Sequence, residues 1–446
     1  MEFRDLIVTP VIILLVYVVA YMARPWLTDE TNLGYFFPAL TLKIIGALAV
    51  GFVYQFYYGG GDTFNYHTQG SRHIWEAMMD SPLKGAQLLM YNGTGEPPHG
   101  TYAYASKILF LHDPSSYAVV RLTAFLDLFT FSAYSGTAVL YAMLSFFGMW
   151  MLFLAFYEDY PWLHRWIAAA TFFIPSVFFW GSGVLKDTIT LSALGVATFT
   201  IRNLLIRGRF RLSHLFLMLL SLYVIFVVKK YILLCYMPAA LIWISAANFF
   251  RIRSVVLRAM TIPVFGVMTV AAAYYAVIKI GEDDKRYSLD KIATTAQVTA
   301  YDIGFYTGRN AGSGYSLGEL DGTFSGMIKL APQAINVSLF RPYLWEVRNP
   351  LMLLSALEGM VILIITLYVI VRQRTRILKT FFNPTVIFCL VFSLTFAFAV
   401  GVSTFNFGTL TRYKIPLMPF YFMAITLMLH HHSNNEMNED AVEETE

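Results

Sequence analysis

Charged residues are scarce in this chain of 446 residues. They make up 13% of it, about half the fraction usual for a soluble domain. By contrast, 57% of the residues are hydrophobic, 17% are aromatic, and the mean hydropathy is +0.57. A single soluble core could not bury this much apolar surface, which excludes a soluble enzyme, a nucleic-acid-binding protein and a disordered scaffold. We therefore predict a polytopic membrane protein.

The chain also lacks the short motifs of the common hydrolases. Its two cysteines, Cys235 and Cys389, lie in apolar stretches and are expected to be packed thiols rather than a disulfide. No CxxC, HExxH or GxSxG sequence occurs, and the nine histidines form no metal-ligand pattern. We therefore expect neither a zinc hydrolase nor a serine hydrolase, and we predict no metal-ligating cluster.

Apolar runs near the length that crosses a bilayer, roughly 20 residues, recur along the chain. Eleven such runs fall at about 7–23, 35–56, 134–156, 165–181, 188–205, 212–228, 231–248, 258–279, 351–371, 382–403 and 411–430. Two long hydrophilic insertions interrupt them, at 57–133 and 280–350. The predicted fold is all-α, a single transmembrane helical bundle over residues 1–432. An acidic tail, 433–446, is expected to be disordered.

Basic residues in short loops predict the orientation of the bundle. Three clusters without an acidic residue should be cytoplasmic: Arg202, Arg207, Arg209 and Arg211; Arg251, Arg253 and Arg258; Arg372, Arg374, Arg376 and Lys379. The long insertions show no such bias, since 279–350 hold eight basic and eight acidic residues and 56–133 hold four and six. We therefore place both insertions on the extracytoplasmic side. The apolar stretch Tyr117–Phe131 contains Arg121 and Asp127, which favours a re-entrant or interfacial helix over a span.

Ionisable groups at the membrane are costly and are therefore candidates for function. The first candidate is the segment 57–67, where three glycines follow the second span and precede Asp62, Tyr66 and His67. Glycine lets the backbone approach a ligand closely, and a carboxylate at this place can act as a general base or bind a divalent cation. The alternative is that Asp62 only caps a helix.

Two more candidates are basic. In the stretch 175–187, Gly-Ser-Gly interrupts an apolar run ahead of Lys186 and Asp187, which suits an anionic head group at a broken helix. The alternative is a helical hairpin in which these two residues pair with each other. Lys229 and Lys230 lie at a short extracytoplasmic turn and can hold a pyrophosphate or, alternatively, extend from the helix ends to the interface.

The last two candidates lie later in the chain. In 340–350, Arg341 and Arg348 offer planar forks for phosphate, Trp345 offers a face for a sugar, and Glu346 lies between them. Glu358, inside the following span, should pair with a cation; an aromatic belt with a structural Arg–Glu pair is the alternative. The final span opens with Arg412, Tyr413 and Lys414, and Pro416 and Pro419 should kink its helix.

These segments resemble a known group of enzymes. Gly60-Gly61-Asp62-Thr63-x-x-Tyr66 resembles the Gly-Thr-Asp-x-x-x-Tyr segment of EpsG/Wzy-type polysaccharide polymerases. Thr411-Arg412-Tyr413-Lys414-Ile415-Pro416 resembles the Arg-Tyr-x-x-Pro entry to a late helix in GT-C-type membrane glycosyltransferases. The stretches 175–187 and 341–346 are similar to motifs of uncharacterised bacterial relatives. Two features depart from the family pattern: the acidic motif follows the second span rather than the first, and Tyr58 replaces an arginine.

The resemblance implies an integral-membrane glycosyltransferase of the bacterial cytoplasmic membrane, acting in envelope or exopolysaccharide assembly. The donor would be a sugar on a polyprenyl-phosphate lipid. Asp62 would activate the acceptor hydroxyl or hold a metal, and Arg412 would lie near the donor phosphate. The expected partners are this lipid, a sugar acceptor, membrane lipids and an envelope-assembly complex, but no nucleic acid. The alternatives are a flippase for lipid-linked oligosaccharides and a non-catalytic scaffold subunit.

Overall fold

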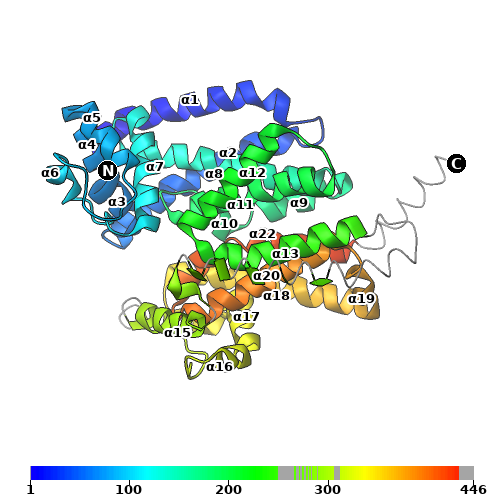
Figure 1. Ribbon diagram of the computed structural model, residues 1–446. Coiled ribbons are helices and arrows are strands. Elements are labelled where there is room, and N and C mark those ends of the chain that lie inside the picture. The colour runs from blue at the N-terminus through cyan, green and yellow to red at the C-terminus, as the bar shows by residue number, and fades with distance from the viewer. Residues whose placement is uncertain are drawn as a thin grey trace. The chain divides into compact units, whose positions relative to one another are not determined.

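The computed structural model describes residues 2–249, 284–288, 290–305 and 312–430, with scattered positions between 266 and 282. In these residues the regular structure is helical (Figure 1), and the one extended pairing is an isolated β-bridge between Gly314 and Asn406. The expectation of an all-α fold is therefore confirmed. The predicted span 258–279, the basic cluster 251–258 and the tail after 433 lie almost wholly outside the described residues.

Seven helices in the described ranges are long and apolar enough to cross a membrane. They are α1 (Phe3–Leu27), α2 (Leu33–Phe52, continued to Tyr57 by the π-helix η1), α8 (Tyr134–Tyr157), α11 (Lys186–Ile201, continued to Ile206 by η4), α13 (Lys230–Phe249), α18 (Pro350–Gln373, continued to Thr380) and α20 (Pro384–Ser403). Two shorter apolar helices are α12 (Leu212–Val228) and α22 (Met418–Leu429). The chain is thus a multi-pass membrane protein.

Two of the predicted spans are helical but interrupted. The run 165–181 divides into α9 (His164–Phe172) and α10 (Pro175–Trp180). Proline disfavours a helical conformation in the residue before it, and Ile174 accordingly has a ψ of 121°. The run 411–430 divides between α21 (Phe407–Tyr413) and α22, and Pro416 lies in the turn that joins them.

The chain divides into two compact units, and the first comprises Met1–Thr200 and Phe210–Lys230. At its centre α8 packs against α1 and α2. It also meets α11 closely, because Gly148 and Gly195 leave no room for a Cβ between the two backbones. The first insertion forms the short helices α3 (Asp62–Tyr66), α4 (Arg72–Asp80), α5 (Pro82–Met90) and α6 (Tyr102–Ala105) and the longer α7 (Pro114–Thr130). In Figure 1 these short helices gather near the beginning of α1, where Arg72 pairs with Glu2.

The second unit comprises Ile201–Arg209 and Tyr231–Glu446. Here α20 packs against α17 (Ala331–Phe340) and α22, and α18 packs against α17 and α22. A Cβ at Gly401 would lie 2.3 Å from the carbonyl oxygen of Ala334, so α17 and α20 are in backbone contact. The described part of the second insertion also contains α15 (Ile292–Ile303) and α16 (Phe324–Lys329). A small apolar core of Ala293, Met327, Ala334 and Val402 joins these helices to α20.

Candidate functional site

A glycine turn at the end of the second apolar helix presents Asp62. Gly59, Gly60 and Gly61 have φ angles of 70°, 138° and 126°, a region that residues with a Cβ rarely adopt. The amide of Gly60 donates to Tyr54 O at 2.8 Å, which closes the end of η1 (Val53–Tyr57). The N-cap of α3 is Gly61, and Asp62 is the first helical residue. The half-buried Asp62 is therefore not the helix cap of the alternative interpretation.

Lys186 contacts polar residues from another part of the first unit. It is the first residue of α11, after the Gly-Ser-Gly interruption, and its side chain is 17% exposed. Its Nζ donates to Ser115 Oγ at 2.7 Å and lies 3.5 Å from Asp113 Oδ2. Lys186 also interacts electrostatically with Asp62. The segments of Asp113 and Lys186 thus meet at this ammonium group, and Asp62 is close enough to act on it electrostatically.

Asp113 forms the acidic side of this contact and also caps a helix. Its carboxylate accepts hydrogen bonds from the amide of Ser115 at 3.2 Å and from Ser116 Oγ at 2.5 Å, at the beginning of α7. Burial alone would raise the pKa of Asp113, but the hydrogen bonds from Ser116 and Ser115 and the charge of Lys186 outweigh it and hold the pKa below its usual range. Asp113 is therefore ionised at neutral pH, and its side chain is 46% exposed.

A second ion pair lies deeper in the same unit. Lys229 Nζ donates to Asp187 Oδ1, and the two side chains are 7% and 0% exposed. Asp187 follows Lys186 in the first turn of α11, and Lys229 is the C-cap of α12. Lys186 and Asp187 thus take different partners. Removing either charge of the buried pair would be costly, so this pair fixes the beginning of α11 to the end of α12.

Lys230, the second lysine of this turn, makes a different contact. Its Nζ lies 5.0 Å from the centre of the Phe226 ring, one turn back in α12. The structure therefore brings together Asp62, Lys186, Asp187 and Lys229 of the predicted residues, with Asp113 and Ser115 in addition. We call these six residues the lysine cluster.

Tyr66 and His67 lie in the packed interior of the first unit. His67 is fully buried, with Nε2 at 3.4 Å from Asp127 Oδ1. Asp127 also accepts hydrogen bonds at 2.6 Å from Ser71 Oγ and from Thr137 Oγ1. Tyr66 is 3% exposed, and its ring packs against Phe110. This buried network ties α7 to α8 and to the π-helix η2 (His67–Ser71) that follows α3, and thereby supports the segment that carries Asp62.

In the second unit, Arg341 and Glu346 form a bidentate ion pair across a short turn. The Arg341 Nε to Glu346 Oε2 distance is 3.0 Å, and Glu346 also accepts the amide of Tyr343 at 2.8 Å. Burial would raise the pKa of Glu346, but these hydrogen bonds, that of Arg341 first, lower it. Trp345 is 81% exposed and stacks on Tyr343. Arg348 is exposed and passes over Gly312.

The remaining predicted residues form two groups on α18 and α21. Glu358, 9% exposed in α18, interacts electrostatically with Lys414, which is fully buried after the end of α21. Glu358 thus has a cationic neighbour, but Lys414 Nζ makes no hydrogen bond within the described structure. The guanidinium of Arg412 lies 5.9 Å from the centre of the Tyr413 ring. Both Arg412 and Tyr413 are partly exposed.

Sequence reasoning missed Lys43, although a lone lysine in the apolar run 35–56 is a usable signal. Lys43 is 1% exposed, and its Nζ donates to Val177 O at 3.2 Å and to Gly181 O at 3.1 Å. Gly181 O also accepts from Ser145 Oγ at 2.5 Å. These bonds hold the end of α10 and the turn that leads to Lys186. Asp113 and Ser115 were missed too, because neither lies in an apolar run.

Comparisons with known proteins return no counterpart: no protein-family model, curated protein or solved structure matches this chain. The resemblance to EpsG/Wzy-type and GT-C-type enzymes therefore rests on the motifs quoted above. In the part of the chain that the structure describes, no three His, Cys, Asp or Glu side chains are gathered closely enough to hold a metal ion by themselves.

Proposed function

We propose that the protein is a glycosyltransferase of the bacterial cytoplasmic membrane, which transfers a sugar from a polyprenyl-phosphate carrier during envelope or exopolysaccharide assembly. The observation that carries the proposal is the lysine cluster, where Asp62 and Lys186 interact at the edge of an apolar helical unit. A lipid-linked donor has an anionic group at the membrane surface. Its transfer needs a base and a cation within reach of the same reacting centre.

The residues divide into two layers with different roles. Asp62, Asp113 and Lys186 are partly exposed and can reach a substrate. Lys229 and Asp187 are buried and neutralise each other, so they position the beginning of α11 rather than bind the substrate. Lys186 is held by Ser115 and the half-exposed Asp113. A pair in that setting is worth little, so a phosphate can replace Asp113 as the partner of the ammonium group.

Charge balance suggests how the phosphate is accommodated. The cluster has three carboxylates and two ammonium groups, so its side chains carry one net negative charge. Asp62 and Asp113 are too few to hold a divalent cation alone, but Mg²⁺ is often bound by one or two carboxylates together with substrate phosphates. If Asp62 holds a metal instead of acting as the base, a divalent cation would bind there together with the donor and offset the phosphate charge.

In the reaction, Asp62 accepts the proton of the acceptor hydroxyl while the oxygen of that hydroxyl attacks the anomeric carbon of the donor sugar. The bond between that carbon and the carrier phosphate breaks, and the carrier leaves with both electrons as a phosphate. Lys186 stabilises the charge that develops on this leaving group. Hydrophobic helices beside the cluster accommodate the lipid tail, and an envelope-assembly complex would supply the acceptor.

The test is a turnover assay with the purified full chain and a panel of polyprenyl-linked sugar donors, in which released carrier phosphate is measured. Because general-base catalysis contributes about 10²- to 10⁴-fold, Asp62→Asn should lower turnover by at least ~100-fold while the melting temperature is kept. Asp80→Asn is the matched control. Asp80 lies in the same insertion but is exposed on α4, paired with Lys84, and its substitution should leave turnover within about twofold of wild type. An active Asp62→Asn variant would remove Asp62 from the mechanism.

A further inference from the structure

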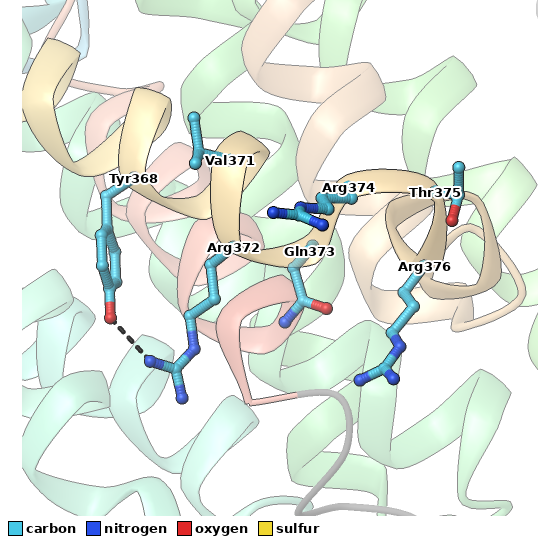
Figure 2. A pocket seen from close by; sticks show the side chains of 7 residues that line it. All are labelled: Tyr368, Val371, Arg372, Gln373, Arg374, Thr375 and Arg376. Carbon is cyan, nitrogen blue, oxygen red and sulfur yellow. Dashed lines mark hydrogen bonds between the residues drawn. The ribbon is translucent and has the colours of Figure 1, made fainter.

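A separate hollow in the second unit is lined by arginines (Figure 2). It has a volume of about 520 Å³, within the range of pockets that hold small ligands. It lies at the end of α18, where the apolar segment Pro350–Thr380 turns, and Arg372, Arg374 and Arg376 contribute to it from one short stretch of chain. Figure 2 shows the side chains of Arg372 and Arg376 extending in the same direction. We call this hollow the arginine pocket.

The positive charge of the arginine pocket is not compensated from within the described structure. All the residues that line it are basic, neutral polar or apolar. Arg372 Nη1 donates to Tyr368 OH at 2.8 Å, and its guanidinium lies 5.9 Å from the centre of that ring. The side chains of Arg374 and Arg376 form no hydrogen bond or ion pair with the residues that the structure describes, although the backbone of Arg374 is hydrogen-bonded within the turn. Three guanidinium groups that repel one another therefore share one site, an arrangement that an anion stabilises.

The backbone around the arginine pocket is held in one conformation. Arg374 has a φ of 46°, which is uncommon for a residue with a Cβ, and it ends α18. The neighbouring Gln373 is 8% exposed, and its Nε2 donates to Leu429 O at 2.9 Å at the end of α22. The turn is thus anchored to a second helix. The backbone that carries the three arginines is therefore held in place by the neighbouring helix.

We propose that the arginine pocket binds a phosphate group, carried by an anionic lipid headgroup or by a soluble phosphate compound. Guanidinium forks match phosphate oxygens in a bidentate manner, which distinguishes this pocket from a diffuse basic surface. The end of a membrane-spanning segment is also the level at which lipid headgroups lie, and basic residues there attract anionic lipids. The proposal is independent of the lysine cluster and of the reaction assigned to it.

The proposal is tested by calorimetric titration of the purified full chain in a neutral detergent with three probes: short-chain phosphatidic acid, phosphatidylcholine with the same chains, and inorganic phosphate. We expect phosphatidic acid to bind and phosphatidylcholine to give no signal. Equal affinity for inorganic phosphate would assign the pocket to a soluble ligand, and weaker affinity would assign it to a lipid. No binding of either phosphate probe would overturn the proposal.

Three triple variants, one of them a control, test whether the phosphate binds in the arginine pocket. Arg372→Gln with Arg374→Gln and Arg376→Gln should weaken binding by at least about tenfold, because basic residues at this level attract anionic lipids. The three corresponding lysine substitutions keep the charge but remove the fork, and should also weaken binding. The control replaces Arg207, Arg209 and Arg211 by Gln, since these are exposed and lie outside the pocket. Equal losses in the control, or full binding by the lysine variant, would show attraction by charge alone and contradict a built site.

Discussion

The ion pairs around Lys186 in the first unit and around Arg341 in the second unit are assembled in different ways. In the first unit, Lys186 meets Asp113, and Asp187 meets Lys229, so each ion pair joins segments that are far apart in the sequence. In the second unit, Arg341 pairs with Glu346 across a turn of a few residues. A long-range pair forms only when the fold brings its partners together, whereas a local pair can form with its own turn. The lysine cluster is therefore a product of the tertiary structure.

Burial separates the two kinds of pair further. The Asp187–Lys229 side chains are 0% and 7% exposed, whereas those of Arg341 and Glu346 are 21% and 20% exposed. Charges that are removed from water depend on their partner far more than charges at a surface. Substitutions in the two pairs should therefore have different effects on the free energy of unfolding.

The largest effect is expected for Asp187→Ala, which leaves the buried ammonium of Lys229 without its carboxylate. The free energy of unfolding should fall by about 3–5 kcal/mol, measured by unfolding of the purified protein in detergent. As a control, Asp187→Leu combined with Lys229→Met replaces both charges by apolar groups and should recover much of the loss. A loss below about 1 kcal/mol in the single variant would mean that Asp187 does not hold Lys229.

An intermediate effect is expected for Arg341→Ala. The guanidinium is partly exposed, so the free energy of unfolding should fall by only about 1–2 kcal/mol, through the lost bidentate pair and the lost contacts with the rings of Tyr315 and Phe407. Arg341→Lys should recover only part of this loss, since lysine keeps the charge but not the planar fork. A loss as large as that of Asp187→Ala would remove the contrast between the units.

The smallest effect is expected for the loss of stability at low pH. The pKa values of Glu346 and Asp113 are both lowered from their ordinary values of 4.5 and 3.8. Each contact therefore contributes fully above the ordinary value and is lost as the pH falls through the lowered pKa. Solvent screens both carboxylates, so each should account for less than about 1 kcal/mol. Melting temperatures between pH 7 and pH 3 should fall less steeply for Glu346→Gln than for wild type. An unchanged slope would show that Glu346 is not involved in the acid response.

Removal of divalent cations should affect the lysine cluster and leave the Arg341–Glu346 pair unchanged, and turnover reports the difference. If a cation binds at Asp62 together with the donor, EDTA should abolish turnover of the wild-type protein, and added Mg²⁺ should restore it. The cation should leave the Arg341–Glu346 pair unaffected, so the melting temperature should stay constant. Full turnover in EDTA would contradict the cation at Asp62 while leaving its role as a base open to the Asp62→Asn assay.

The sequence predicts the class of fold well because hydrophobicity is a local property. Runs such as 7–23 and 134–156 are continuous helices in the structure. The run 165–181 is not, because Pro175 divides it. The candidate site was predicted in part: Asp62, Lys186 and Lys229 stand out as charges beside apolar runs. Asp113, the partner of Lys186, does not, because it lies in a polar insertion and becomes significant only when the beginning of α7 meets the beginning of α11.

The most direct test of the account measures the binding of polyprenyl phosphate, without a sugar, to the purified protein in lipid nanodiscs. Lys186→Met should weaken this binding by at least about tenfold, the loss of one charge-assisted hydrogen bond, without lowering the melting temperature appreciably. Lys84→Met is the control: it removes a lysine of α5 that pairs with Asp80 at the end of α4, and it should bind like wild type. Wild-type affinity in Lys186→Met would contradict the central claim that the lysine cluster receives the phosphate of a lipid.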